Sequence, residues 1–111
     1  DVQVAAIPLM KQWTKPADNY TEITTKGNVV ISFAESRQLL SRIGIAGEIL
    51  PTPGHTEHCV SLLLDDGALF TGDLPAEQHA FGDPTILATW QMLRARGAKR
   101  IYPAHGPLWS L

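Results

Sequence analysis

The chain has 111 residues, of which 44% are hydrophobic and 18% are charged. This balance is typical of a globular chain and excludes an intrinsically disordered one. The formal net charge of −2 argues against nucleic acid as a partner, no apolar run approaches the ~20 residues of a membrane span, and the single Cys59 excludes an internal disulfide framework. No signal-peptide pattern precedes residue 20, so we expect a cytoplasmic protein.

The first 31 residues contain one expected pair of strands. Residues 20–25 alternate as a strand does, residues 26–28 (Lys-Gly-Asn) predict a turn, and the β-branched run at 29–31 predicts a partner strand.

A helix is expected to follow at once. Ser32 and Glu35 fit a capping box, and Gly44 is a residue that ends helices. The side chains expected to face inward are Phe33, Leu39, Leu40 and Ile43.

The central part of the chain predicts a strand at 45–50, broken near Gly47, and a β-hairpin. The apolar run 60–64 predicts a buried strand, and the turn Asp65-Asp66-Gly67 leads into a second strand at 68–71. Residues 74–82 are expected to form a loop.

The last third predicts a helix and a strand. Asp83 is expected to cap a helix that has Pro84 at its first position and ends at Gly97, and residues 99–102 predict a short strand. The helical side chains expected to face inward are Ile86, Leu87, Trp90 and Leu93. Hairpins that alternate with single helices indicate the α/β class.

Three loops each follow a strand and carry one side chain that can bind a metal: His55, Asp73 and His105. Two imidazoles and a carboxylate suit zinc, and also iron or manganese. The three residues lie 18 and 32 positions apart, so only the fold can bring them together. On this evidence alone, three separate exposed loop residues remain an equal alternative.

The local sequences around these residues resemble a known family. Thr52-Pro53-Gly54-His55-Thr56, Phe70-Thr71-Gly72-Asp73 and Tyr102-Pro103-Ala104-His105-Gly106 occur in the order of the last three metal motifs of the metallo-β-lactamase superfamily. The segment 59–67 between them is similar to the connecting hairpin of that family. The resemblance covers residues 29–107.

The resemblance implies a metal-dependent hydrolase with two zinc ions. His55 would bind the first ion, His105 the second, and Asp73 would bridge both and act as the catalytic carboxylate. A bridging hydroxide would attack an ester, thioester, lactone or phosphoester of a small-molecule substrate. In keeping Asp73 at this motif, the chain resembles the glyoxalase II, lactonase, nuclease and general hydrolase branches of the family. The interval of 32 residues between Asp73 and His105 leaves no room for the domain that RNA-processing members of the family carry there.

One large departure from the family concerns the upstream motif His-x-His-x-Asp-His, which is absent from this chain. The family domain is about twice as long, an αββα sandwich with two sheets. We therefore interpret residues 1–111 as a single partial domain, the C-terminal half of such a sandwich, with one mixed sheet and about two helices. The start at Asp1 indicates either a processed product or a piece of a longer protein. We expect the chain alone to be a poor catalyst with an incomplete metal site.

The remaining candidates have more ordinary interpretations. His58 is interpreted as a rim residue, and Cys59 as a small buried residue in a place where the family often has serine. His79 is either a surface residue or a substrate-facing one, because substrate loops of the family often lie there.

Two functional hypotheses remain open. Either the chain is the C-terminal portion of a metallohydrolase, or it is a stand-alone binding or assembly module derived from the same fold. Retention of all three ligands favours the first. In both cases an uncovered sheet face would contact the missing N-terminal half or a second copy of the chain, through residues 60–64, the Ile101 region or a terminal Trp.

Overall fold

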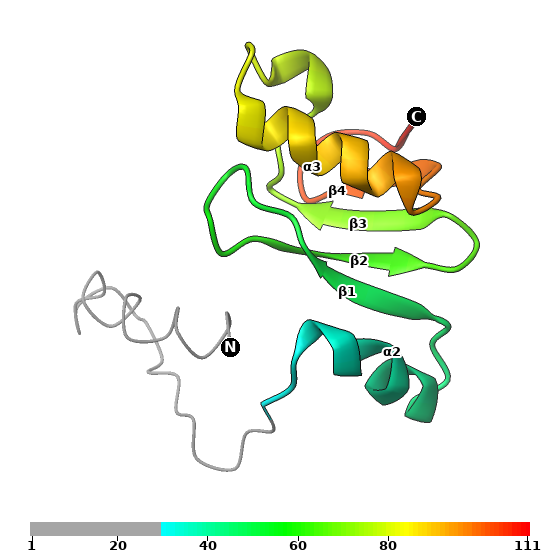
Figure 1. The fold of residues 1–111 in the computed structure, drawn as a ribbon. Helices are drawn as coiled ribbons and strands as arrows, with labels where there is room; N and C mark the ends of the chain where they lie inside the picture. Colours follow the sequence, from blue (N-terminus) through cyan, green and yellow to red (C-terminus); the bar gives the residue numbers. More distant parts are fainter. Residues whose placement is uncertain (1–29) are drawn as a thin grey trace, which may run out of the picture. The chain divides into compact units, whose positions relative to one another are not determined.

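The computed structural model describes residues 30–111, within which Phe33–Leu111 form one compact unit (Figure 1). The strand expected at 20–25 and the turn at 26–28 lie outside the described residues. Val30 and Ile31, expected to belong to a strand, have no regular structure. They lead directly into the first turn of a helix instead.

Helix α2 spans Phe33–Arg42 and begins directly after Ser32, as expected. Its end is built around Gly44, which has φ +83°. The N–H of Gly44 donates to the carbonyl of Ser41 at 3.1 Å, and the N–H of Ile45 donates to that of Leu40 at 2.9 Å. These two bonds form a Schellman motif, which requires a left-handed residue at this position and therefore favours glycine.

The buried face of α2 is narrower than expected. Ser36 and Leu40 are buried, whereas Leu39 is exposed and Ile43 is 66% exposed. The interpretation of Leu39 and Ile43 as inward residues is wrong, because α2 lies along one edge of the sheet, beside strand β1 (Gly47–Pro51), and meets it only through Ser36 and Leu40 (Figure 1).

The described residues contain one open mixed sheet of five strands in the order β1-β2-β3-β4-β5. The strands are Gly47–Pro51 (β1), Val60–Leu64 (β2), Ala68–Gly72 (β3), Arg100–Pro103 (β4) and Trp109–Ser110 (β5). β3 and β4 are parallel, and the other neighbouring pairs are antiparallel. Within residues 30–111, the expected β2–β3 hairpin, the α/β class and the single mixed sheet with two α-helices are thus confirmed.

Helix α3 spans Pro84–Ala95 and connects β3 to β4. The expected cap is confirmed, because Asp83 Oδ1 accepts from the N–H groups of Thr85 at 2.8 Å and Ile86 at 3.2 Å. Leu87, expected inward, is exposed. Thr89 is buried in its place and donates its hydroxyl to the carbonyl of Pro53 at 2.7 Å. The loop 74–82 contains a short 3₁₀ helix, η2, at Glu77–His79.

The core lies between α3 and one face of the sheet (Figure 1). Leu69 and Leu93 are completely buried there, and the indole N–H of the buried Trp90 donates to the carbonyl of Pro75 at 2.9 Å. Burial of such side chains contributes about 1.5–3 kcal/mol each. Four paired residues, one on each of β2, β3, β4 and β5, line this face of the sheet: Leu63, Leu69, Ile101 and Trp109.

The residues next to these along the strands form a second paired row. They point to the opposite face of the sheet, because successive side chains of a strand alternate between the two faces. Its members are Ile49, Leu62, Phe70 and Tyr102. The rings of Phe70 and Tyr102 stack with their centroids 4.9 Å apart, and Phe70 is exposed. Ile101 itself belongs to the buried row under α3, whereas its neighbour Tyr102 lies on the opposite face, and the expected interface through this region stays a prediction. Across residues 30–111, neither helix combines the length and hydropathy needed to cross a bilayer.

Candidate metal centre

The His55 loop connects β1 to β2 and is fixed at its base. The N–H of Thr52 donates to the carbonyl of Cys59 at 2.9 Å, and the buried hydroxyls of Thr52 and Ser61 lie 2.7 Å apart. A side chain on Gly54 would place its Cβ 2.5 Å from Leu74 Cδ1. Any larger residue there would require the buried Leu74 side chain to shift. The residue before His55 therefore packs against the residue that follows Asp73.

Asp73 lies in a tight turn at the end of β3. Gly72 has φ +59°, a conformation that favours glycine, and the N–H of Leu74 donates to the carbonyl of Thr71 at 3.2 Å. This turn changes the direction of the chain at the edge of the sheet. The Asp73 side chain is half-exposed there.

The His105 loop is joined to this turn. β3 and β4 are parallel, so their carboxyl ends meet at the same sheet edge. The N–H of Ala104 donates to the carbonyl of Gly72 at 2.9 Å. This bond fixes the His105 backbone next to that of Asp73, and the His105 Nε2 atom lies 3.3 Å from Asp73 Oδ1.

The distance between these two atoms is compatible with two arrangements. In the absence of a metal, the two side chains are simply in polar contact with each other. When two atoms are ligands of the same tetrahedral zinc ion, each about 2.0–2.2 Å from the metal, they lie about 3.3–3.6 Å from each other. The His105 side chain is 89% exposed, which leaves room for a further ligand group beside it.

His55 does not complete a three-ligand cluster in this conformation. Its side chain is exposed, and the described part of the chain holds no group of three or more His, Cys, Asp or Glu side chains that could bind a metal. The structure thus brings Asp73 and His105 together and places the backbone beside His55 at the same edge. The ligand set of His55, Asp73 and His105 stays a prediction.

The neighbouring candidates have structural contacts. Cys59 is half-buried, and its Sγ accepts from the N–H of Thr56 at 3.3 Å and lies 3.2 Å from the Thr56 hydroxyl, so it closes the His55 loop. The imidazole of His58 lies 3.5 Å from the exposed carboxylate of Glu57. His79 lies in η2, exposed, with its ring centroid 6.5 Å from that of Phe81.

The acidic pair at the β2–β3 turn is structural. Asp65 binds Arg37 at 2.9 Å, and Asp66 binds Arg100 at 3.1 Å. The N–H of Ala68, which donates to Asp66 Oδ1 at 3.0 Å, lowers the pKa of the Asp66 carboxyl, and Arg100 contributes to the same shift. These carboxylates hold the opposite end of β3 from Asp73.

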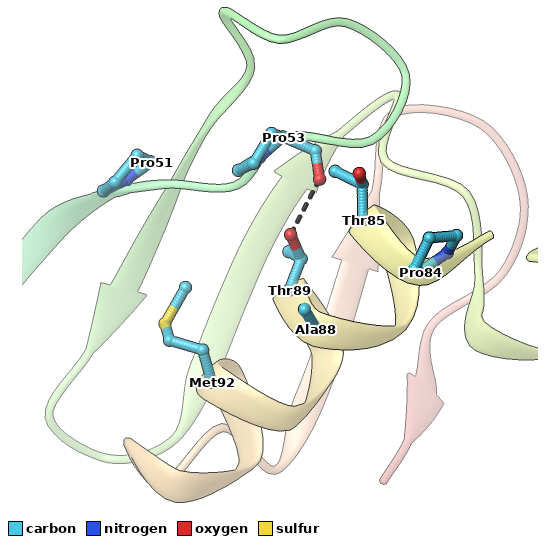
Figure 2. Close-up of a pocket in the computed structure, with 7 residues that line it drawn as sticks. All are labelled: Pro51, Pro53, Pro84, Thr85, Ala88, Thr89 and Met92. Atoms are coloured by element: carbon cyan, nitrogen blue, oxygen red, sulfur yellow. Dashed lines mark hydrogen bonds between the residues drawn. The ribbon is translucent and has the colours of Figure 1, made fainter.

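A shallow apolar groove lies elsewhere, between α3 and the start of the His55 loop (Figure 2). Its lining residues are Pro51, Pro53, Pro84, Thr85, Ala88, Thr89 and Met92. Sequence reasoning missed this groove. The three prolines at loop and helix ends were the available signal, but only the fold shows that they face one another.

Comparisons of the chain with known protein families, curated proteins and solved structures gave no match.

Proposed function

We propose that this chain is the C-terminal portion of a metal-dependent hydrolase of the metallo-β-lactamase superfamily, one half of its αββα sandwich. The observation that carries the proposal is the Asp73–His105 pair, whose side-chain atoms lie 3.3 Å apart on loops joined by a backbone hydrogen bond. The motif order and the packing of Gly54 against Leu74 support a place for His55 at the same edge.

In this proposal the described residues hold part of the metal centre. Asp73 and His105 would hold one metal ion, and Asp73 and His55 would contribute to a second; zinc, iron or manganese would suit these ligands. The metal, when bound, lowers the pKa of water and polarises the scissile bond of a small ester, thioester, lactone or phosphoester. Gly72 and Ala104 keep the two ligand loops in register through their hydrogen bond.

The remaining ligands come from outside residues 30–111 in this proposal. They belong to the missing N-terminal half or to a second copy of the chain, and the intact protein is cytoplasmic. The chain by itself is inactive or nearly so, because neither ion has its full ligand set.

The first experiment measures metal binding by the 111-residue chain, by cobalt absorption and zinc calorimetry. Four-ligand zinc sites reach at least about 10 kcal/mol, which corresponds to a Kd of about 50 nM, so we expect this incomplete site to bind more weakly. Asp73→Asn and His105→Gln should abolish the binding. His79→Gln is the matched control, because His79 is exposed and lies outside the motifs. Binding that survives both site substitutions, or two tightly bound zinc ions per chain, would contradict the proposal.

The second experiment uses the intact gene product, with a panel of thioester, lactone and phosphodiester substrates and with metal content measured in parallel. Asp73→Ala should remove both ions and all activity, because this carboxylate is shared. His55→Ala and His105→Ala should each remove one ion. Cys59→Ser should change little, since its Sγ serves as an acceptor for Thr56. Activity lost in Cys59→Ser with metal content intact would favour a cysteine mechanism.

The alternative is a non-catalytic module derived from the same fold. A polar contact between Asp73 and His105 needs no metal, which favours this alternative if the intact gene product lacks an upstream His-x-His-x-Asp-His. The intact mass of the expressed protein and the absence of metal binding would together decide for it.

A further inference from the structure

The hydroxyl of Thr71 is buried without a hydrogen bond. Among residues 30–111 it is the only buried side-chain oxygen or nitrogen that has no partner, and Thr71 is 2% exposed. A buried hydroxyl in this state destabilises a folded chain, because it has lost its hydrogen bonds to water and gained none in return. Such groups are rare in folded proteins, and a role at a functional site is one of the reasons for which they persist.

The backbone of β3 is irregular at the same residue. Phe70 pairs with Tyr102 and Gly72 pairs with Pro103, so the register between β3 and β4 shifts at Thr71. Bulges of this kind are frequent beside functional sites, where they redirect a side chain. The unpartnered hydroxyl and the irregular pairing therefore coincide two residues before Asp73.

Other buried hydroxyls at this end of the sheet hold the loop between β1 and β2. Those of Thr52 and Ser61 lie 2.7 Å apart, and that of Thr89 donates to the carbonyl of Pro53 at 2.7 Å (Figure 2). Each of these hydroxyls fixes part of a loop through a hydrogen bond. Thr71 lies beside the turn that follows β3, but in this conformation its hydroxyl makes no such bond with any described residue.

The N–H of Asp73 is a donor at the right distance along the chain. Threonine hydroxyls accept from the N–H group two residues further on, and a rotation about the χ1 bond exchanges the positions of the hydroxyl and the methyl group. We propose that Thr71 is a positioning residue of the candidate metal centre. When the Asp73 carboxylate holds a metal ion, the Thr71 hydroxyl accepts from the N–H of Asp73 and fixes this ligand. The inference rests on the proposed function and adds to it a residue that does not touch the ion.

The proposal predicts opposite effects on folding and on metal binding when the hydroxyl is removed. Without a metal, the hydroxyl is unpaired and destabilises the fold, so its loss should stabilise the chain. With a metal, the hydroxyl supports a ligand, and loss of such a support typically weakens metal binding about 10–100-fold. A buried hydroxyl with no role would give the gain in stability and leave metal binding unchanged.

Thermal unfolding of the 111-residue chain in a chelator, together with cobalt titrations followed by absorption, tests both effects. Thr71→Val should raise the melting temperature and should raise the cobalt dissociation constant about tenfold or more. Thr89→Val is the contrasting variant, and it should lower the melting temperature because the Pro53 carbonyl loses its donor. Thr85→Val, at an exposed position of α3, is the matched control and should change neither quantity.

Thr71→Ser keeps the hydroxyl and should bind cobalt as the wild type does. The proposal is overturned if Thr71→Val binds cobalt as tightly as the wild type. It is also overturned if Thr71→Val lowers the melting temperature as Thr89→Val does, because the hydroxyl would then already have a partner, such as an enclosed water. A wild-type chain that binds no cobalt contradicts this inference and the proposed function together. Binding that Asp73→Asn abolishes and Thr71→Val leaves unchanged contradicts the role of Thr71 alone.

Discussion

Ser36 closes the outer edge of the sheet, and its replacement by alanine is a sensitive test of the fold. The Ser36 hydroxyl accepts from the N–H of Ile49 in β1 at 2.9 Å and donates to the carbonyl of Phe33 at 2.7 Å. β1 pairs with β2 on one side only, so its outward N–H groups need another partner. Ser36 is 1% exposed, and water therefore cannot replace its hydroxyl without a shift of α2.

The expected loss follows from two opposing terms. Leaving a buried N–H unsatisfied costs about 1–3 kcal/mol, whereas alanine is a better helix former than serine by about 0.5 kcal/mol. Ser36→Ala should thus lower the free energy of unfolding by about 1.5 kcal/mol. With a urea slope of about 1.5 kcal/mol/M, the unfolding midpoint should fall by about 1 M.

The matched control is Ser41→Ala, the same substitution at an exposed position of the same helix. It should raise the midpoint slightly, since only the helix-propensity term applies. If urea titrations followed by circular dichroism give the same midpoint for both variants, Ser36 does not support β1 and the reasoning is refuted.

Three further predictions concern local contacts. Asp83→Ala should lower the free energy of unfolding by about 1 kcal/mol, because the N-terminal N–H groups of α3 lose their acceptor. Gly47→Ala should cost about 2–3 kcal/mol, because the new Cβ would lie 2.6 Å from the backbone oxygen of Leu63, which cannot move without breaking the β1–β2 pair. Asp66→Asn should lower the melting temperature at pH 7 but not at low pH. The N–H of Ala68 and then Arg100 hold the pKa of Asp66 below its ordinary value of 3.8, so its contribution is present above about pH 4 and is lost as the pH falls through the folded-state pKa.

Each of these predictions has a clear contrary result. Thermal unfolding of Asp83→Ala at the wild-type temperature would mean that the cap is dispensable. If Gly47→Ala is as stable as the wild type, the strands leave room for a Cβ at position 47, and the expected clash at 2.6 Å with the Leu63 oxygen does not occur. A difference between wild type and Asp66→Asn that persists unchanged at pH 2–3 would mean that charge plays no part in the hairpin.

The local elements could be predicted from the sequence because their signals are local. The turn at Gly67, the cap at Asp83 and the left-handed residue Gly44 each act within four residues. Burial was harder to predict, because it depends on what each element packs against. Leu39, Ile43 and Leu87 have the spacing of core residues, yet α2 meets only a sheet edge and α3 turns Thr89 inward instead.

The candidate site was predictable only in part for the same reason. The meeting of Asp73 with His105 follows from parallel pairing of β3 and β4, which no pattern in the sequence reports directly. The exposed side chain of His55 is free of such a constraint, and the sequence gives no rule for its direction. The left-handed backbone of Phe81, with φ +50°, could not be predicted, because the neighbouring Gly82 already accounts for a turn there.

The order of strands in the sheet has a consequence for how the protein is made. Each described strand pairs with the next one along the chain, so the sheet can grow in one direction as the polypeptide leaves the ribosome. Only three residues separate β2 from β3, whereas 27 residues separate β3 from β4. Closing the longer connection costs roughly 2 kcal/mol more in chain entropy. We therefore expect docking of β4 to be a late step of assembly. Asp73 follows β3 and His105 follows β4, so we expect the two side chains to meet only when folding is nearly complete. A metal that needs both residues as ligands would then bind the folded chain and not its folding intermediates.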